Sequence, residues 1–237
     1  MTIILSLGVI QALGIISLRY LNSNAGVFIH GFISGLISST ALTVSLAKKS
    51  NTMTDSQKSV ESLSFLSASF AMLTQGLFLC IITLSNIDFK SLNLFLFPMV
   101  TTIALMIRRA IHTKDISLPK QELHLNWLSI LKLSLFVCLI LSISIYSKNW
   151  IGDMGLQMIT FIISLFEAHG SIVASSQLLS THKIEVSMFH SLIALSILAS
   201  YVSKLIIVYI LATPYLKRKV TLWVVLILIS LSLSLFV

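Results

Sequence analysis

Residues 154–181 read MGLQMITFIISLFEAHGSIVASSQLLST, and this stretch decides the fold class. A helix that spans a bilayer needs about 20 mostly apolar residues. Glu167, near the centre of the stretch, is its only Asp, Glu, Lys or Arg residue. A core helix of a soluble protein needs a polar face toward water, which this stretch lacks. We therefore interpret it as a transmembrane helix that carries an acid at mid-depth.

The rest of the chain repeats this pattern. Of its 237 residues, 56% are hydrophobic and 10% are charged, whereas soluble domains carry about 25% charged residues. The mean hydropathy of +0.98 also excludes an intrinsically disordered chain. The sequence predicts an all-α polytopic membrane helix bundle with about eight transmembrane helices. The other seven expected helices cover 1–18, 25–47, 62–87, 91–107, 133–147, 186–216 and 220–237.

The two halves of the chain resemble each other at a spacing of 129 residues. Gly26, Phe32, Ile33, Leu36, Ser62 and Leu66 match Gly155, Phe161, Ile162, Leu165, Ser191 and Leu195. We predict a first four-helix repeat over 1–110, a polar connecting loop over 111–127 and a second four-helix repeat over 128–237. Because four is an even number of crossings, the repeats are expected to run parallel, related by an axis along the membrane normal.

Loop charges give an expected orientation, because Lys and Arg concentrate in cytoplasmic loops. Over eight crossings, eight of these residues fall on one side and six on the other, which places both termini in the cytoplasm. The formal net charge of +8 then lies in loops beside anionic lipid. The sequence shows no concentrated basic face of the kind that binds nucleic acid, so the lipid bilayer is the expected partner.

Polar residues lie near the middle of several expected helices. Ionisable groups in hydrocarbon cost about 2.5–3.5 kcal/mol, so they persist where they pair or line a cavity. Glu167 and Lys204 correspond to Ser38 and Gln75 at the 129-residue spacing. We expect a mid-membrane polar site between the halves, with Glu167 as a cation or proton ligand and Lys204 as its counter-charge. A static buried ion pair that fixes helix packing is the alternative.

His169 follows Glu167 by two residues. On a regular helix their side chains point about 200° apart, so both reach one cavity only if the helix breaks there. In that case they form a proton relay; otherwise His169 is a packing residue. The hydroxyls of Ser38, Ser39 and Thr40 are further candidate ligands for an ion or solute, although such groups also bond to the carbonyls of their own helix.

A stripe of small residues follows one face of the expected helix at 25–47. Gly31, Gly35, Ser39 and Thr43 recur every four residues. Small-residue stripes let helix backbones approach closely in membranes, so we predict a packing role for them.

The sequence offers no motif for catalysis. HExxH, GxSxG, paired-cysteine metal spacing and a phosphate-binding glycine loop are all missing from it. We predict neither an enzyme nor catalytic residues, and neither a metal site nor a cofactor.

The stretch Gly31–Ser50 reads GFISGLISSTALTVSLAKKS. This glycine-rich, Ser-Ser-Thr-Ala signature resembles the membrane domain of unknown function 4010, which commonly follows an MgtC/SapB-type membrane domain in bacterial proteins. The similarity continues through Met72, through residues 152–170 and through the Lys204 helix. The resemblance implies a protein of the bacterial inner membrane and supplies no substrate.

This chain departs from the family pattern at the predicted site. The family usually has Asp-x-Asp where this chain has Glu167 and His169, a basic residue at the position of Gln75, and often an Asn at that of Ser200. If the family's acidic pair is functional, its chemistry is altered in this chain.

Two functional hypotheses follow. The first is a transporter or channel-like protein for a small ion or solute, with a site formed by Glu167, His169, Lys204, Gln75 and the hydroxyls of 38–40. The second is a non-transporting interaction or regulatory subunit of another membrane protein. The small-residue stripe and the MgtC/SapB-type domain, which this sequence does not include, motivate the second. A homo-oligomer or a separate membrane partner is left open.

Overall fold

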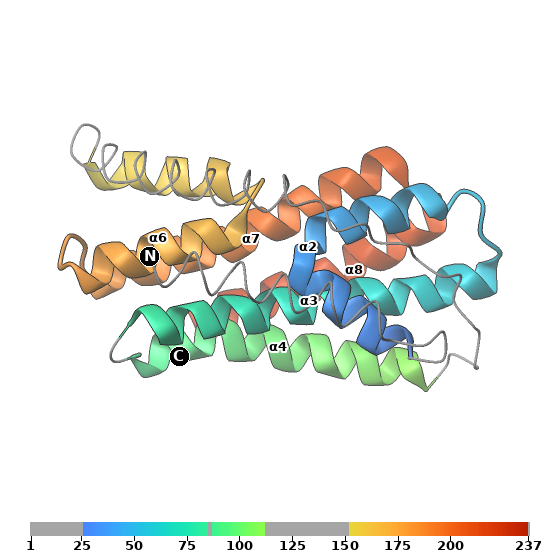
Figure 1. The fold of residues 1–237 in the computed structure, drawn as a ribbon, viewed down its shortest axis with the longest axis horizontal. Helices are drawn as coiled ribbons and strands as arrows, with labels where there is room; N and C mark the ends of the chain where they lie inside the picture. Colours follow the sequence, from blue (N-terminus) through green and yellow to red (C-terminus); the bar gives the residue numbers. More distant parts are fainter. Residues whose placement is uncertain (1–25, 85–86, 112–151, 237) are drawn as a thin grey trace.

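The computed structural model describes residues 26–84, 87–111 and 152–236, and these residues form helices joined by short connections (Figure 1). The all-α class is confirmed, and no strand occurs in these three ranges. The expected helices at 1–18 and 133–147 lie outside the described residues. In chain order the helices are α2 (Val27–Lys49), α3 (Asp55–Thr83), α4 (Phe89–Ala110), a helical segment at 152–164, α6 (Ala168–Ser180), α7 (Val186–Leu211) and α8 (Pro214–Ser234).

One end of the bundle, which we call end A, gathers the ends of α2, α4 and α7 and the starts of α3 and α8. Asn51, just after α2, donates from Nδ2 to the Leu211 carbonyl at the end of α7 (3.0 Å). Arg109, at the end of α4, donates from Nη2 to the Tyr215 hydroxyl at the start of α8 (3.0 Å). These contacts hold the loops of end A together.

The opposite end, end B, gathers the end of α3 and the starts of α4 and α7. His190, near the start of α7, has its Nε2 2.8 Å from Oδ2 of Asp88, the residue that precedes α4. α3 therefore runs from end A to end B, whereas α7 runs from end B to end A (Figure 1).

α2 is a broken helix that enters and leaves at end A. Its first half packs parallel to the first half of α3, with Gly31 on Ser64 and Gly35 on Ala68. At Ser38 the backbone turns extended (φ −165°, ψ 103°), and the second half returns to end A (Figure 1). The Ser38 hydroxyl accepts a hydrogen bond from the Ala41 N–H (3.2 Å), as an N-cap does at a helix start. Residues 27–37 then rise about 16 Å at 1.5 Å per residue, about half of a hydrocarbon core.

Residues 152–180 form a second broken helix, which enters and leaves at end B. Segment 152–164 begins there, where Gln157 Nε2 donates to Sδ of Met188 near the start of α7 (3.5 Å). The backbone turns extended at Glu167 (φ −148°, ψ 97°). α6 then returns toward end B, where Ser176 Oγ lies 3.6 Å from Sγ of Cys80 near the end of α3.

Two sequence expectations are corrected by this geometry. Neither 25–47 nor 154–181 forms one uninterrupted helix, because each reverses at an extended residue whose side chain caps the following helix. In addition, α3 and α7, which correspond at the 129-residue spacing, run in opposite directions, whereas parallel repeats would give them the same direction. We call the two broken elements hairpin A (27–49) and hairpin B (152–180).

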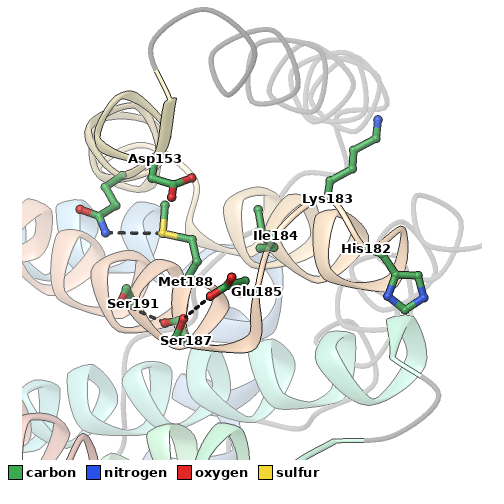
Figure 2. A pocket seen from close by; sticks show the side chains of 9 residues that line it. Asp153, His182, Lys183, Ile184, Glu185, Ser187, Met188 and Ser191 are labelled. Atoms are coloured by element: carbon green, nitrogen blue, oxygen red, sulfur yellow. Dashed lines mark hydrogen bonds between the residues drawn. The ribbon is translucent and has the colours of Figure 1, made fainter.

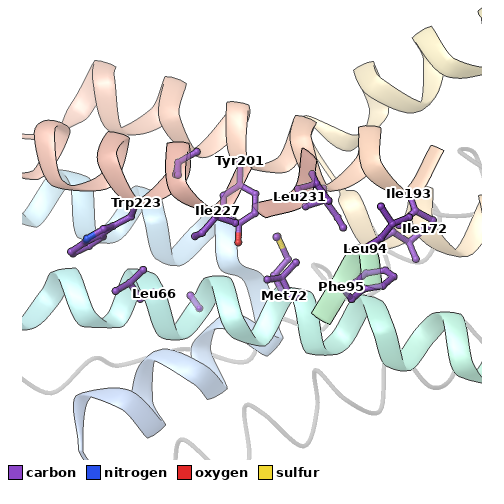
Figure 3. Close-up of a cluster of buried hydrophobic side chains, with 14 of the residues drawn as sticks. Leu66, Met72, Leu94, Phe95, Ile172, Ile193, Tyr201, Trp223, Ile227 and Leu231 are labelled. Atoms are coloured by element: carbon purple, nitrogen blue, oxygen red, sulfur yellow. The ribbon is translucent and has the colours of Figure 1, made fainter. Parts of the chain in front are cut away.

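The core lies between the long helices α3, α4, α7 and α8 (Figure 3). Met72, Phe95, Tyr201 and Ile227 contribute fully or nearly fully buried side chains to it. Helix association in a bilayer rests on close van der Waals contact more than on exclusion of water, so the tight fit of these side chains holds the bundle.

Large apolar side chains also cover the outside of the bundle. Val100 on α4, Ile210 on α7 and Ile229 on α8 are 63%, 73% and 51% exposed. By length and composition alone, four helical stretches of the described part suffice to cross a membrane: Val27–Lys49, Ser62–Thr83, Phe89–Ala110 and Val186–Leu211. The first of them is hairpin A, which reverses at Ser38. An apolar exterior of this extent requires lipid, so the chain is a membrane protein.

Candidate functional site

A small polar cavity lies where the tips of hairpins A and B meet. Its volume is about 20 Å³, which is room for one water-sized guest. The lining residues come from both tips, from α3 and from α7: Ile37, Ser38, Ser39, Thr40, Met72, Phe166, Glu167, Ala168, His169 and Ser200. Five residues that the sequence marked as candidate ligands are thus brought together: Ser38, Ser39, Thr40, Glu167 and His169.

Both tips are built by the same local device. Ser38 and Glu167 each adopt an extended backbone, and each caps the helix that follows. Glu167 Oε1 accepts from the His169 N–H at 3.1 Å. The N-terminus of a helix carries a partial positive charge that attracts a carboxylate. The Glu167 carboxylate is therefore stabilised there, although it is buried.

Glu167 and His169 face the same cavity because the helix is interrupted after residue 164 and begins again only at Ala168. His169 Nδ1 lies 3.0 Å from Glu167 Oε1. On an unbroken helix the two side chains would point to different faces. The condition set by the sequence for a joint site, a break at this position, is therefore met.

The second ring nitrogen of His169 also has a partner. His169 Nε2 lies 3.3 Å from the Met72 carbonyl oxygen on α3. A carbonyl only accepts, so Nε2 carries a hydrogen. With Nε2 protonated, the contact between Nδ1 and the carboxyl group needs a further proton, on one partner or the other. Both ring nitrogens of His169 thus face oxygen acceptors, and a proton placed between Nδ1 and Oε1 completes both contacts.

Lys204 lies behind the cavity on α7 and is fully buried. Its Nζ donates to Ser200 Oγ (2.7 Å), to Met72 Sδ (3.1 Å) and to the Ser200 carbonyl (3.4 Å). In the described part of the chain no carboxylate lies within ion-pair distance of Nζ. Its charge attracts the Glu167 carboxylate only at longer range. The expected direct ion pair is therefore not formed, and the acid pairs with His169 instead.

Gln75 does not line the cavity. It is 2% exposed, and neither of its amide atoms has a hydrogen-bond partner among the described residues. It lies three residues after Met72 on α3, so it is close to the site in the chain without contacting the space between the tips.

The small-residue stripe is split by the break at Ser38. Gly31 and Gly35 pack against α3 so closely that an added Cβ would lie 2.9 Å from Ser64 Cα and 2.5 Å from Ala68 Cα. Ser39 and Thr43 lie on the other half of hairpin A, where Thr43 Oγ1 donates to the Ser39 carbonyl (2.8 Å). Gly31 and Gly35 thus lie in close contact with α3 of the same chain.

Sequence reasoning missed a polar cluster at end B. His190 Nε2 lies 2.8 Å from Asp88 Oδ2 and 3.1 Å from Ser91 Oγ, and the Ser91 hydroxyl also donates to Asp88. One ring nitrogen faces both partners, so the geometry lacks the relay through two nitrogens that activates a serine. The cluster fastens the start of α7 to that of α4.

The carboxyl group of this cluster has a shifted pKa. Partial burial raises the pKa of Asp88, but the hydrogen bonds from Ser91 and the charge of His190 lower it more, so the net direction is down. No sequence signal pointed to this cluster, because His190 lies about 100 residues from Asp88 and Ser91 in the chain and each member alone resembles an ordinary helix-end residue.

Two further residues of the site also went unpredicted as ligands. Met72 accepts from His169 through its carbonyl and from Lys204 through its sulfur, and Ser200 both lines the cavity and binds Lys204. In the described residues no group of three or more His, Cys, Asp or Glu side chains is arranged to hold a metal ion.

Comparison with known proteins gives one finding. A family model described as a domain of unknown function (DUF4010) matches residues 6–212. Searches of the curated proteins and of the solved structures return no match.

Proposed function

Because the chain belongs to the DUF4010 family, whose description gives no activity, we propose a function from the site itself: the protein moves a small ion or solute across the membrane through the cavity between the hairpin tips. One observation carries this proposal. Two broken helices enter from opposite ends of the bundle, and their tips meet at a polar cavity at mid-depth.

An internal duplication with inverted orientation supports the proposal. Ser38 and Glu167, the two break residues, lie 129 residues apart, as do Gln75 and Lys204 on α3 and α7. Within the described residues, hairpin A with α3 and α4 corresponds to hairpin B with α7 and α8, and the two groups run in opposite directions, as an axis in the membrane plane would relate them. Substrate sites of many transporters lie at such a repeat interface and use broken helices.

Inverted halves also give a reason for transport in particular. Two half-structures of similar fold and opposite direction let a single site open toward either side by equivalent movements. A packing motif would not need polar groups at both tips, and buried polar groups are costly in hydrocarbon. The Glu167–His169 pair and the hydroxyls of 38–40 are therefore proposed as ligands, with no enzymatic step.

Loop charges orient this fold more clearly than they orient eight straight helices. In the described residues, end A carries Lys48, Lys49, Arg108, Arg109, Lys217, Arg218 and Lys219. End B carries Lys90 and Lys183 beside Asp88, Asp153 and Glu185. We place end A on the cytoplasmic side of a bacterial inner membrane. Since α8 runs toward end B, the C-terminal end of α8 lies outside, unlike the sequence expectation.

The rival hypothesis, a non-transporting regulatory subunit, loses one of its two supports. The glycines of the small-residue stripe that favoured a partner helix pack instead against α3 of the same chain. A folded wild-type protein that carries no current in the transport test below would favour this interaction role.

The test is flux in vesicles reconstituted with the purified protein. Electrophysiology on a solid-supported membrane, with a panel of H⁺, Na⁺, K⁺, Mg²⁺ and Cl⁻ gradients, is expected to show a current in wild type. Glu167→Gln and Lys204→Met are expected to abolish that current while the protein still folds. Asp88→Asn and Lys90→Met, which neutralise an acid and a lysine at end B outside the cavity between the tips, are matched controls and should keep it. Wild-type currents in both site variants would refute the proposal, as would no current for any ion in wild type.

A further inference from the structure

We propose that the Glu167–His169 pair binds and releases one proton during transport, and that this proton reaches the pair from end B. The inference rests on the proposed function and names the coupling ion of that same site. Four observations carry it: the hydrogen bonds of the pair, the position of Lys204, the cavity beside the pair and a polar face that leads to end B.

The hydrogen bonds fix where the proton lies. His169 Nε2 faces the Met72 carbonyl at 3.3 Å, and His169 Nδ1 faces Glu167 Oε1 at 3.0 Å. The proton between Nδ1 and Oε1 makes the pair neutral overall, either as imidazolium and carboxylate or as imidazole and carboxylic acid. When this proton leaves, the Nδ1 lone pair faces a carboxylate oxygen, and the two repel. Release of the proton therefore separates the two side chains, which line the cavity.

Lys204 compensates the charge that release creates. Loss of the shared proton leaves a net charge of −1 on the pair. The Lys204 ammonium has only neutral partners in direct contact, Ser200 and Met72. A buried cation without an adjacent anion is unfavourable, so a negative pair nearby lowers the energy of Lys204 as well. The lysine thus makes the proton-free state accessible at this depth.

No other ionisable side chain of the described residues faces the pair. Hairpin A contributes Ser38, Ser39 and Thr40 to the cavity, α3 contributes Met72, and α7 contributes Ser200 with Lys204 behind it. The titration of the pair is therefore set by Glu167, His169 and Lys204 alone within that part of the chain.

A polar face of segment 152–164 leads from the pair to end B. Gln157, Thr160 and Ser164 follow one another at spacings of three and four residues, which place them on one side of segment 152–164, and Ser164 stands at its end nearest to Glu167 in the chain. Thr160 and Ser164 are 4% and 1% exposed, and Ser164 Oγ has no hydrogen-bond partner among the described residues. A hydroxyl held in this way is free to accept or donate a passing proton.

The face opens into a polar pocket at end B. This pocket has a volume of about 630 Å³ and is lined by Gln157 together with Asp153, Lys183, Glu185 and Ser191 (Figure 2). Charged side chains around a wide opening keep it hydrated and supply groups that exchange protons with solvent. The proton thus passes from this pocket along the face to Glu167.

Infrared titration of the protein in lipid nanodiscs tests the inference without requiring transport. In wild type, we expect the carboxylic-acid band of Glu167 and the imidazole bands of His169 to change together with pH. Glu167→Gln should remove the carboxyl component. His169→Asn keeps a hydrogen-bond donor but cannot titrate, so it should shift the carboxyl component to another pH. Asp88→Asn, which changes a carboxyl group at end B outside this pocket, is the control and should leave the Glu167 and His169 signals as they are.

Independent titration of the two groups, or an unchanged carboxyl band in His169→Asn, would overturn the proton inference and leave the proposed transport standing. Coupled titration in a protein that carries no current would overturn the transport function instead.

The route has its own variants. Thr160→Val and Ser164→Ala remove hydroxyls with little change of shape, and exchange of the Glu167 proton for deuterium after a solvent switch should be slowed in both. Ser232→Ala, which removes a hydroxyl on α8 away from this face, should exchange like wild type. Wild-type exchange in Thr160→Val and Ser164→Ala would exclude entry along this face.

Discussion

Substitution of Gly35 by alanine tests how hairpin A is held in place. A Cβ at this position would lie 2.5 Å from Ala68 Cα and 2.9 Å from Ala68 Cβ, whereas carbon atoms in contact prefer about 3.5–4.0 Å. The obstacle includes backbone of α3, which cannot rotate aside, so hairpin A must move by about 1 Å. Overpacking of this kind costs about 1–3 kcal/mol, and we expect the upper part of that range.

The assay is thermal unfolding in detergent, in a background without Cys138. Unfolding is monitored by the reaction of the buried Cys80 thiol with a fluorogenic maleimide. A loss of about 3 kcal/mol corresponds to a fall in Tm of about 6–12 °C for a chain of this size. Gly26→Ala is the matched control, because a Cβ there meets no atom within 4 Å. A Tm for Gly35→Ala equal to that of the control would refute the packing of hairpin A on α3.

Two more substitutions probe the site and end B. Ser200→Ala removes the shortest hydrogen bond of Lys204, 2.7 Å from Oγ, and hydrogen bonds to charged groups contribute about 1.5–3 kcal/mol, so we expect a lower Tm and a reduced current; unchanged values of both would exclude this support. Asp88 has a pKa lowered by folding, so its stabilisation is complete above about pH 4 and is lost as pH falls through the lower folded value. Asp88→Asn should lower the free energy of unfolding at neutral pH by less than about 1 kcal/mol, because the carboxyl group is exposed. It should also weaken the fall of Tm at acid pH, whereas Asp153→Asn should leave that fall unchanged.

Much of the site could be predicted from the sequence. Charge-free length located the helices, and the cost of polar groups in hydrocarbon singled out Glu167 and the hydroxyls of 38–40, which the structure brings to one cavity. The link between Glu167 and His169 could be stated only as a condition, because it depends on a break that helical periodicity does not record.

The reversals themselves could not be predicted in this way. A continuous helix and one that folds back at Ser38 have the same length and the same hydropathy, so both fit 25–47 equally well. Treatment of 25–47 and 154–181 as full crossings placed Lys217–Lys219 opposite Lys48 and Lys49, although all five lie at end A. It also made the halves parallel. The Lys204–Glu167 pair was overestimated for another reason: the ammonium is satisfied by Ser200, one turn before it on α7, and by Met72 of α3, a contact between helices that the sequence does not record.

The sidedness of the two hairpins tests the central claim most directly. Single cysteines replace Gly26 and Thr52, which flank hairpin A, or Asp153 and His182, which flank hairpin B, in a background without Cys80 and Cys138. A membrane-impermeant maleimide is then applied to intact cells and to inverted vesicles. We predict that positions 26 and 52 react from the cytoplasmic side only, and that positions 153 and 182 react from the opposite side only. Labelling of 26 and 52 from opposite sides would show that the helix crosses the membrane, and the account of two hairpins that meet tip to tip would be wrong.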